Sequence, residues 1–198
     1  MKFLFIGNSY TYFNEMPKIF ESICREHGMD VTADSITKGG YSLAHYLSEE
    51  NPYGIAVREK IAAEPFDFIV LQEQSVLPAL HPETFLRSAE EMAALLAPTG
   101  ARLVLYETWG RRDGHKTLTD NGWTHEEMQA LLKAAYTEAA ERIGAVLVRA
   151  GERMSAAYRG EKGEAVYNPD GTHPSEIGSR LVAECFFETL FPEAAQSK

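Results

Sequence analysis

The sequence predicts an α/β protein, a three-layer α/β/α sandwich in which helices cover both faces of a five-stranded parallel sheet. Short apolar runs alternate along the chain with longer stretches whose apolar residues recur at helical spacing, which indicates strands joined by helical crossovers. One of these runs, residues 66–71, is almost continuously apolar, as expected for a strand covered on both faces. A chain of 198 residues with 44% hydrophobic content can bury one substantial core, so we expect one domain over residues 1–198.

Five short runs, each rich in apolar residues and bounded by turn-forming or polar residues, are the predicted strands: residues 2–6, 29–36, 66–71, 102–106 and 145–148. The first run stops at Gly7, and the second leads into Gly39 and Gly40. Glycines at such points mark the ends of strands, because they permit sharp turns.

Five longer stretches with helical spacing are the predicted helices: residues 16–27, 41–47, 82–96, 124–143 and 175–190. Pro82 opens the third helix, and Thr124 with Glu127 has the pattern of a capping box for the fourth. Ser175 is the expected N-cap of the last helix. The segment between the fourth strand and Thr124 is predicted as a long polar loop.

The formal net charge of −10 argues against a nucleic-acid backbone or an anionic membrane as the main partner, since both favour clustered cations. Neutral and cationic small molecules remain open. The chain has no apolar segment near the roughly 20 residues that span a bilayer, and the first apolar run is too short for a secretory signal. Cys24 and Cys185 lack metal-ligand spacing and are expected to be buried free thiols. We therefore expect a cytoplasmic protein.

An acid and an imidazole, Asp170 and His173, lie three residues apart just before the last predicted helix, and Ser9 follows the first predicted strand. A nucleophilic serine needs a base, and that base needs a carboxylate to fix its tautomer. Because carboxyl ends of parallel strands share one edge of a sheet, these residues are expected to meet there. The alternative is a structural histidine beside a turn-forming aspartate.

The chain order of Ser9, Asp170 and His173, with Gly7-Asn8-Ser9 at one end and Asp-x-x-His-Pro at the other, resembles the SGNH, or GDSL-like, hydrolases over nearly the whole chain. The resemblance implies the flavodoxin-like SGNH hydrolase fold, with Ser9 as nucleophile, His173 as general base and Asp170 as its orienter. Asn8 replaces the Asp of the family's Gly-Asp-Ser block. Because Asn keeps a short hydrogen-bonding side chain, we expect activity to survive that change.

The sequence Gly39-Gly40-Tyr41-Ser42 resembles the family's second block, in which a glycine N–H joins the N–H of the nucleophile in the oxyanion hole. Gly40 is favoured over Gly39 because Ser42 follows it by two residues, as in the family. The alternative is a glycine pair that only ends the strand.

The third block departs furthest from the family, because Gln72-Glu73-Gln74-Ser75 replaces the usual Gly-x-Asn-Asp. A Gln amide can donate to an oxyanion as an Asn amide does, and Gln74 is favoured over Gln72 by its distance past the strand. The alternative for both is a polar side chain that faces solvent and takes no part in the site. Asn8, Gln72 and Trp109 are candidate substrate contacts. Trp109 can stack on a sugar or wall an acyl pocket, or it can simply anchor its loop.

The expected function is that of a serine esterase acting on small acyl esters, with acetyl esters of carbohydrates included. A small-molecule ester is the expected partner, no cofactor is implied, and the sequence has no HExxH or His-Cys cluster that would suggest a catalytic metal. The alternative is a non-catalytic small-molecule or carbohydrate-binding module on the same scaffold. A nucleotide-binding flavodoxin-like protein is disfavoured, because no Gly-rich phosphate loop follows the first strand.

Overall fold

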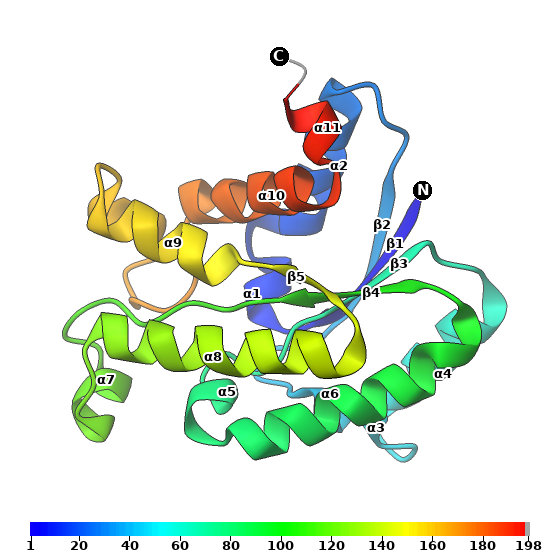
Figure 1. Cartoon of the computed structure of the whole chain (residues 1–198), viewed down its shortest axis with the longest axis horizontal. Coiled ribbons are helices and arrows are strands. Elements are labelled where there is room, and N and C mark those ends of the chain that lie inside the picture. Colours follow the sequence, from blue (N-terminus) through cyan, green and yellow to red (C-terminus); the bar gives the residue numbers. More distant parts are fainter. Residues whose placement is uncertain (197–198) are drawn as a thin grey trace.

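The computed structural model describes residues 1–196 and has at its centre a sheet of five parallel strands in the order β2-β1-β3-β4-β5 (Figure 1). The strands are β1 (Lys2–Gly7), β2 (Thr32–Thr37), β3 (Phe68–Leu71), β4 (Arg102–Tyr106) and β5 (Val146–Val148). The predicted five-stranded parallel sheet is therefore confirmed.

The second strand starts three residues later than the sequence indicated, because the backbone at Gly28 and Met29 still closes the end of α2, which ends at Glu26. The Met29 N–H donates to the Cys24 carbonyl at 3.0 Å, and Gly28 has a left-handed φ of 73°. This is the usual way in which a glycine ends a helix, and it uses the backbone that a longer strand would need.

Side chains of β1 point alternately to the two faces of the sheet, as the pleat requires. Phe3 and Phe5 pack into one apolar cluster, and Leu4 and Ile6 pack into the other. The first face is covered by α2 (Met16–Glu26), α9 (Ala150–Arg159) and α10 (Glu176–Leu190), and the second by α3 (Leu43–Leu47), α4 (Pro52–Ala63), α6 (Pro82–Leu96) and α8 (His125–Ile143). Figure 1 shows these two helical layers above and below the sheet.

The predicted helix caps and thiols are confirmed. The Thr124 hydroxyl accepts from the Glu127 N–H at 3.1 Å while the Glu127 carboxylate accepts from the Thr124 N–H, and the Ser175 hydroxyl accepts from the Gly178 N–H at 3.2 Å. Cys24 and Cys185 are buried and free, and burial raises the pKa of their thiols to about 12 and about 11. Both thiols are therefore inert at neutral pH.

Two longer helices, α4 and α9, were not predicted. Several short helices were not predicted either: α1 (Ser9–Tyr12), η1 (Phe13–Glu15), α5 (Leu77–Leu80), η2 (Ala97–Thr99), α7 (Lys116–Asn121), η3 (Gly163–Val166) and α11 (Pro192–Ala195). The longer α4 was missed because its buried residues are Gly54 and Val57, which leave no strong apolar stripe. The polar loop after β4 contains α7, which ends at Gly122 with φ of 67°. Within residues 1–196, none of the helices combines the length and the apolar character needed to cross a membrane.

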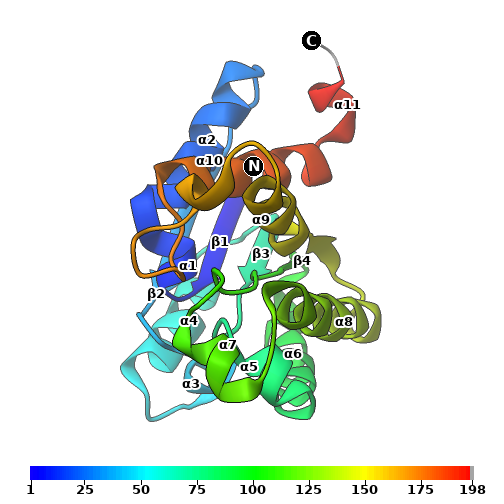
Figure 2. The ribbon, with the colours of Figure 1, turned by 90° about the vertical axis from the view of Figure 1, so that its left-hand side faces the viewer.

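The order of the strands fixes where a ligand can bind. The chain moves outward from β1 to β2 and then returns to the other side of β1 to form β3, so the direction of winding reverses between β1 and β3. Loops diverge at such a point and leave a crevice beyond the carboxyl ends of the strands. Figure 2 looks toward that edge, where α1, α5, α7 and the segment before α10 face the viewer.

Candidate active site

Ser9 begins α1 directly after β1, and the preceding Asn8 holds it there. The Asn8 side-chain oxygen accepts from the Tyr10 N–H at 3.2 Å, and its Nδ2 donates to the Tyr41 carbonyl at 2.9 Å and the Glu73 carbonyl at 3.4 Å. Asn8 is 2% exposed. The hydrogen-bonding groups of its side chain therefore serve the protein's own turns. Asn8 also lines the cavity beside Ser9, so its role as a substrate contact stays a prediction.

The turn needs a glycine at position 7. A Cβ there would lie 2.5 Å from Thr11 Oγ1 and 2.7 Å from Gln72 Oε1, closer than a Cβ approaches an atom to which it is not bonded. Gly7 thus allows the Thr11 and Gln72 side chains to pack against the backbone before Ser9.

The segment with Asp170 and His173 forms a turn that its own sequence closes. Asp170 Oδ1 accepts from the N–H groups of Thr172 at 2.9 Å and His173 at 3.0 Å, while Oδ2 accepts from His173 Nδ1 at 2.6 Å. Gly171 supplies the left-handed φ of 69° that the turn requires. One aspartate therefore shapes the backbone and orients the imidazole.

The carboxyl of Asp170 stays ionised in this setting. Partial burial acts to raise its pKa, but the hydrogen bonds from the His173 ring and from the two backbone N–H groups outweigh it, so that the pKa is lowered. An ionised orienter is what stabilises an imidazolium during proton transfer.

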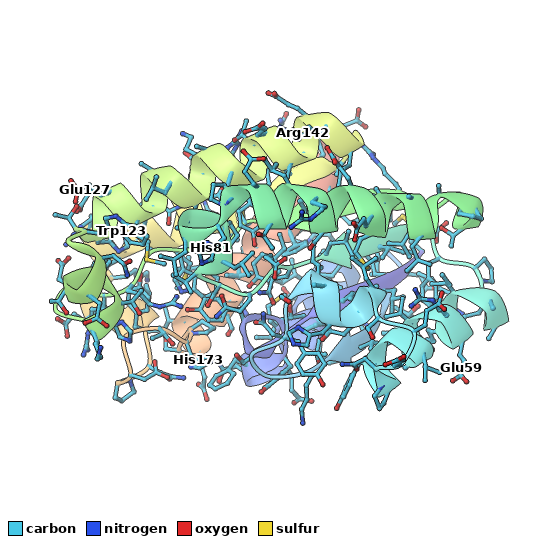
Figure 3. All side chains as sticks on the ribbon, turned by 90° about the horizontal axis from the view of Figure 1, so that it is seen from below. Glu59, His81, Trp123, Glu127, Arg142 and His173 are labelled. Atoms are coloured by element: carbon cyan, nitrogen blue, oxygen red, sulfur yellow. The ribbon has the colours of Figure 1, made fainter. Side chains whose placement is uncertain are left out.

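His173 joins the two ends of the chain. Its Nε2 lies 2.9 Å from Ser9 Oγ, across 164 residues of sequence. Because Nδ1–H donates to Asp170, Nε2 carries the lone pair and can accept the Ser9 hydroxyl proton. In Figure 3 His173 lies at the margin of the molecule, on the side opposite Arg142 of α8. As expected from their places at the carboxyl edge of the sheet, Ser9, His173 and Asp170 meet there, with the imidazole within hydrogen-bond distance of both partners.

Phe13 lies flat on the His173 ring, with centroids 4.2 Å apart and planes at 11°. The next residue, Asn14, has a left-handed φ of 52°, as does Glu15 at 54°, a strained conformation for residues other than glycine. Asn14 Nδ2 holds it by donating to the Pro174 carbonyl at 3.0 Å and to Ser179 Oγ at 2.9 Å. The η1 segment is thereby fixed against the histidine.

The loop after β4 supports the same turn from the other side. Trp109 Nε1 donates to the Thr172 carbonyl at 3.0 Å, and the Arg112 N–H donates to the Gly171 carbonyl at 2.9 Å. Trp109 is fully buried and its ring lies 4.6 Å from that of Tyr10. The interpretation of Trp109 as a substrate contact is therefore wrong, because the indole anchors the loop, as in the alternative reading.

A cavity of about 240 Å³ opens beside Ser9, lined by Asn8, Ser9, Tyr10, Gly40, Gln74, Ser75, Arg111, Thr172 and His173. The Ser9 N–H is at the first position of α1, where a helix leaves its N–H groups without an intrahelical acceptor. Gly40 is exposed with φ of 77°, and within residues 1–196 no hydrogen bond engages its N–H. Both of these N–H groups thus belong to residues that line the cavity.

Gln72 and Gln74 have opposite environments although one residue separates them. Gln72 is fully buried. Its Oε1 accepts from the Asn8 N–H and from Thr11 Oγ1, both at 2.9 Å, and its Nε2 donates to the Glu73 carbonyl. Gln72 is therefore wrong as a substrate contact, because its amide is wholly used inside the protein.

Gln74 instead lines the cavity. Its Oε1 accepts from the N–H groups of Val76 and Leu77, both at 3.0 Å, which assigns the other end of the amide as the NH₂ group. No hydrogen bond within the described residues engages that Nε2. The side chain is thus fixed by its oxygen and keeps two N–H donors available.

Between these glutamines, Glu73 points inward and was not singled out from the sequence. It is 1% exposed, and its Oε1 accepts from the N–H groups of Gln74 at 2.5 Å and Leu43 at 3.2 Å. Burial raises its pKa to about 7, although these two hydrogen bonds oppose the change. The carboxylate ties the Gln74 backbone to the start of α3.

Four residues that line the cavity were not predicted to belong to the site: Tyr10, Ser75, Arg111 and Thr172. Of these, Arg111 alone carries a charge. Its guanidinium donates to the Tyr10 hydroxyl and, at 2.8 Å, to Ser75 Oγ. The only signal in the sequence was the pair of cations after Trp109, and nothing in it separated buried Arg111 from Arg112.

No protein-family model matches the chain, and no curated protein matches it either. Solved structures do. A protein from Slackia heliotrinireducens, provisionally named as an SGNH hydrolase, is 33% identical, with a TM-score of 0.85 over 96% of this chain and 98% of that chain. A DUF4886 family protein from Bacteroides uniformis is 18% identical, with a TM-score of 0.78 over 100% and 86%. An acetylxylan esterase from Geobacillus stearothermophilus is 14% identical, with a TM-score of 0.63 over 100% and 97%.

These similarities define the class of protein first: an enzyme of the carboxylic ester hydrolase kind, built on a parallel α/β/α sandwich. At 33% identity over nearly the full length of both chains, the relationship extends beyond shared fold. The chain belongs to the SGNH, or GDSL-like, hydrolase family.

Proposed function

We propose that the protein is a serine esterase that hydrolyses small acyl esters through an acyl-enzyme. The observation that carries the proposal is the unbroken chain of hydrogen bonds from Ser9 Oγ through His173 to Asp170, at 2.9 and 2.6 Å, beside a cavity with free N–H donors. A chain in that order is what acyl transfer by a serine requires.

In the first half of the reaction, Ser9 Oγ attacks the ester carbonyl carbon and its proton passes to Nε2 of His173. The tetrahedral intermediate then collapses, the bond to the alcohol oxygen breaks, and His173 returns the proton to that oxygen. In the second half, a water attacks the acyl-enzyme with His173 again as base, and the carboxylic acid leaves as Ser9 regains its proton.

Charge that develops on the carbonyl oxygen needs donors that are already in place. The N–H groups of Ser9 and Gly40 and the Nε2 of Gln74 are the three donors that we assign to this oxyanion hole. Their support is that no hydrogen bond within residues 1–196 engages any of the three, and that the Gln74 side chain is fixed by its two Oε1 hydrogen bonds.

The small volume of the cavity, about 240 Å³, favours short acyl groups. Acetyl esters of carbohydrates are one such class, and an acetylxylan esterase has the same fold. Because Trp109 is buried, it offers no surface on which a sugar could stack. The proposal of a carbohydrate ester therefore rests on the shared fold with the acetylxylan esterase.

The test is Ser9→Ala, assayed on a panel of p-nitrophenyl esters from acetate to octanoate and on acetylated sugars. The variant should lose about a thousandfold or more in kcat/KM without a change in melting temperature. Ser22→Ala, on the exposed side of α2, is the matched control and should behave as wild type. A fluorophosphonate that labels a residue other than Ser9 contradicts the assignment, and a lack of both labelling and turnover favours the non-catalytic binding module.

A further inference from the structure

Arg111 is a buried cation on the wall of the cavity. It is 6% exposed, and among residues 1–196 no carboxylate lies within 4.0 Å of its guanidinium. Its neighbour Arg112 is more exposed and pairs with Glu164 at 3.2 Å. Buried charges in proteins are normally paired, because an isolated one loses its hydration without compensation. Arg111 therefore lacks a partner that its position calls for.

The guanidinium is held in place by neutral groups. It donates to the Tyr10 hydroxyl and to Ser75 Oγ at 2.8 Å, and it lies 5.5 Å from the centre of the Tyr10 ring. The Arg111 carbonyl accepts from Nδ1 of the buried His125 at 2.8 Å. A guanidinium has five N–H donors, so two hydrogen bonds leave the cation fixed but incompletely used. Its buried Nε has no hydrogen-bond partner among residues 1–196.

The two residues that hold the guanidinium also locate it. Tyr10 directly follows the nucleophile Ser9, and Ser75 directly follows the oxyanion donor Gln74. Arg111 thus bridges the loops after β1 and β3, and all of these residues line one cavity. A substrate whose ester group reaches Ser9 places its next few atoms near the guanidinium.

None of the residues that line this cavity is acidic. Two carboxylates of the surrounding framework are engaged elsewhere: Asp170 by His173 and two N–H groups, and Glu73 by the N–H groups of Gln74 and Leu43. The cavity is therefore locally cationic in a chain of net charge −10. The net charge of the whole chain left neutral and cationic ligands open, but it does not describe the charge around this cavity.

We propose that Arg111 selects esters that carry a carboxylate near the scissile bond, on either the acyl or the alcohol part. The proposal deepens the esterase function and rests on it. A substrate carboxylate would supply the missing counter-charge through charge-assisted hydrogen bonds, and an ester without it would leave the buried cation unpaired. The volume of about 240 Å³ matches roughly eight water molecules at about 30 Å³ each, enough for a short dicarboxylic half-ester.

The experiment compares pairs of esters that differ in one charge. For the acyl part, monoethyl succinate is compared with ethyl butyrate; for the alcohol part, 4-acetoxybenzoate is compared with 4-acetoxybenzamide. Wild type should prefer the carboxylate in at least one pair by about tenfold or more in kcat/KM, and the pair that responds identifies the part of the substrate that faces Arg111. Equal rates within both pairs overturn the proposal.

Arg111→Gln keeps a side chain that can still contact Tyr10 and Ser75 but removes the charge. It should lose about tenfold more on the charged ester than on its neutral partner, whereas Arg111→Lys should retain part of the preference. Arg87→Gln, exposed on α6, makes the same change in net charge and should retain all of it. Equal losses on both members of a pair would show that Arg111 only pins the loops, and would overturn the proposal.

Two measurements keep the inference independent of folding and of turnover. In wild type, succinate should inhibit hydrolysis of a neutral ester more strongly than succinamide; equal inhibition counts against the proposal. If no ester is turned over, calorimetry decides: monoethyl succinate binding to Ser9→Ala, lost in Ser9→Ala/Arg111→Gln, supports the Arg111 site while the esterase function fails. Turnover of neutral esters without charge preference leaves the esterase and removes the Arg111 site.

Discussion

The turn that carries Asp170 and His173 and the loop that carries Gln72 and Gln74 form two walls of one site, yet they are built differently. The side chain of Asp170 shapes the turn through residues at most three positions away, because it accepts from the N–H groups of Thr172 and His173 and from the His173 ring. The loop after β3 is shaped by partners far away in sequence, Asn8, Thr11 and Leu43. The local sequence of the turn is enough to predict its geometry. The conformation of the loop depends instead on distant residues that pack against it.

The largest effect on activity should come from replacing Asp170, the carboxylate of the turn. Asp170→Asn keeps an oxygen for the N–H groups of Thr172 and His173 but can present an NH₂ group to Nδ1, which removes the preference for the productive tautomer. We expect a loss of roughly a thousand- to ten-thousandfold in kcat with the melting temperature nearly unchanged. Asp120→Asn, on α7, is the control. A loss below tenfold would show that His173 does not need Asp170.

The two glutamines allow the loop to be tested at positions of like chemistry. Gln74→Ala should lower kcat about ten- to a thousandfold with little change in KM, because the donor acts mainly in the transition state. Gln72→Ala should affect kcat much less and instead destabilise the fold by about 1–3 kcal/mol, since the buried Asn8 N–H loses its acceptor. Each variant serves as the control of the other, by steady-state kinetics and denaturant unfolding.

The reverse ranking would move the oxyanion donor to Gln72. Unchanged kcat in both variants would mean that the backbone N–H groups of Ser9 and Gly40 form the hole alone. Either result would weaken the contrast between Gln74, assigned to catalysis, and Gln72, assigned to the packing of the loop.

The smallest effect concerns pH and the buried Glu73. Because burial raises the pKa of its carboxyl from 4.5 to about 7, the folded state binds a proton more tightly than the unfolded state. Stability from this group is present below about pH 4.5 and is lost as the pH rises to about 7 and beyond. Glu73→Gln should therefore gain about 2–3 kcal/mol of unfolding free energy relative to wild type between pH 5 and pH 8.

Chemical denaturation at several pH values measures this gain. Glu91→Gln, exposed on α6, should show no such change. If the difference in unfolding free energy between Glu73→Gln and wild type is the same at every pH, burial does not raise the pKa of the Glu73 carboxyl.

The same contrast explains what could be predicted from the sequence. The strands, the caps at Thr124 and Ser175 and the approach of His173 to Ser9 follow from local patterns and from the meeting of parallel strand ends. The burial of Asn8, Gln72 and Trp109 does not, because a polar or aromatic residue after a strand can face either the cavity or the framework behind it. That choice depends on residues up to a hundred positions away.

Arg111 shows the limit most clearly. The adjacent Arg111 and Arg112 differ in which side of the loop they face. Two residues of α8 fix that orientation: Gln129 accepts from the Gly110 N–H, and the His125 ring bonds to the Arg111 carbonyl. No pattern within the loop's own residues carries this information. The helix α4 was missed for a related reason, since it packs through a glycine and a single valine.

The sequence separation of 164 between Ser9 and His173 also bears on how the protein is made. During synthesis the serine leaves the ribosome first, and the imidazole that we propose as its base is added only after every strand of the sheet. Until then the nascent chain contains an ordinary, unreactive alcohol. Proteolytic removal of the segment from Asn168 onward would return the protein to that state, so reactivity toward a fluorophosphonate reports that both ends of this span are present and folded together.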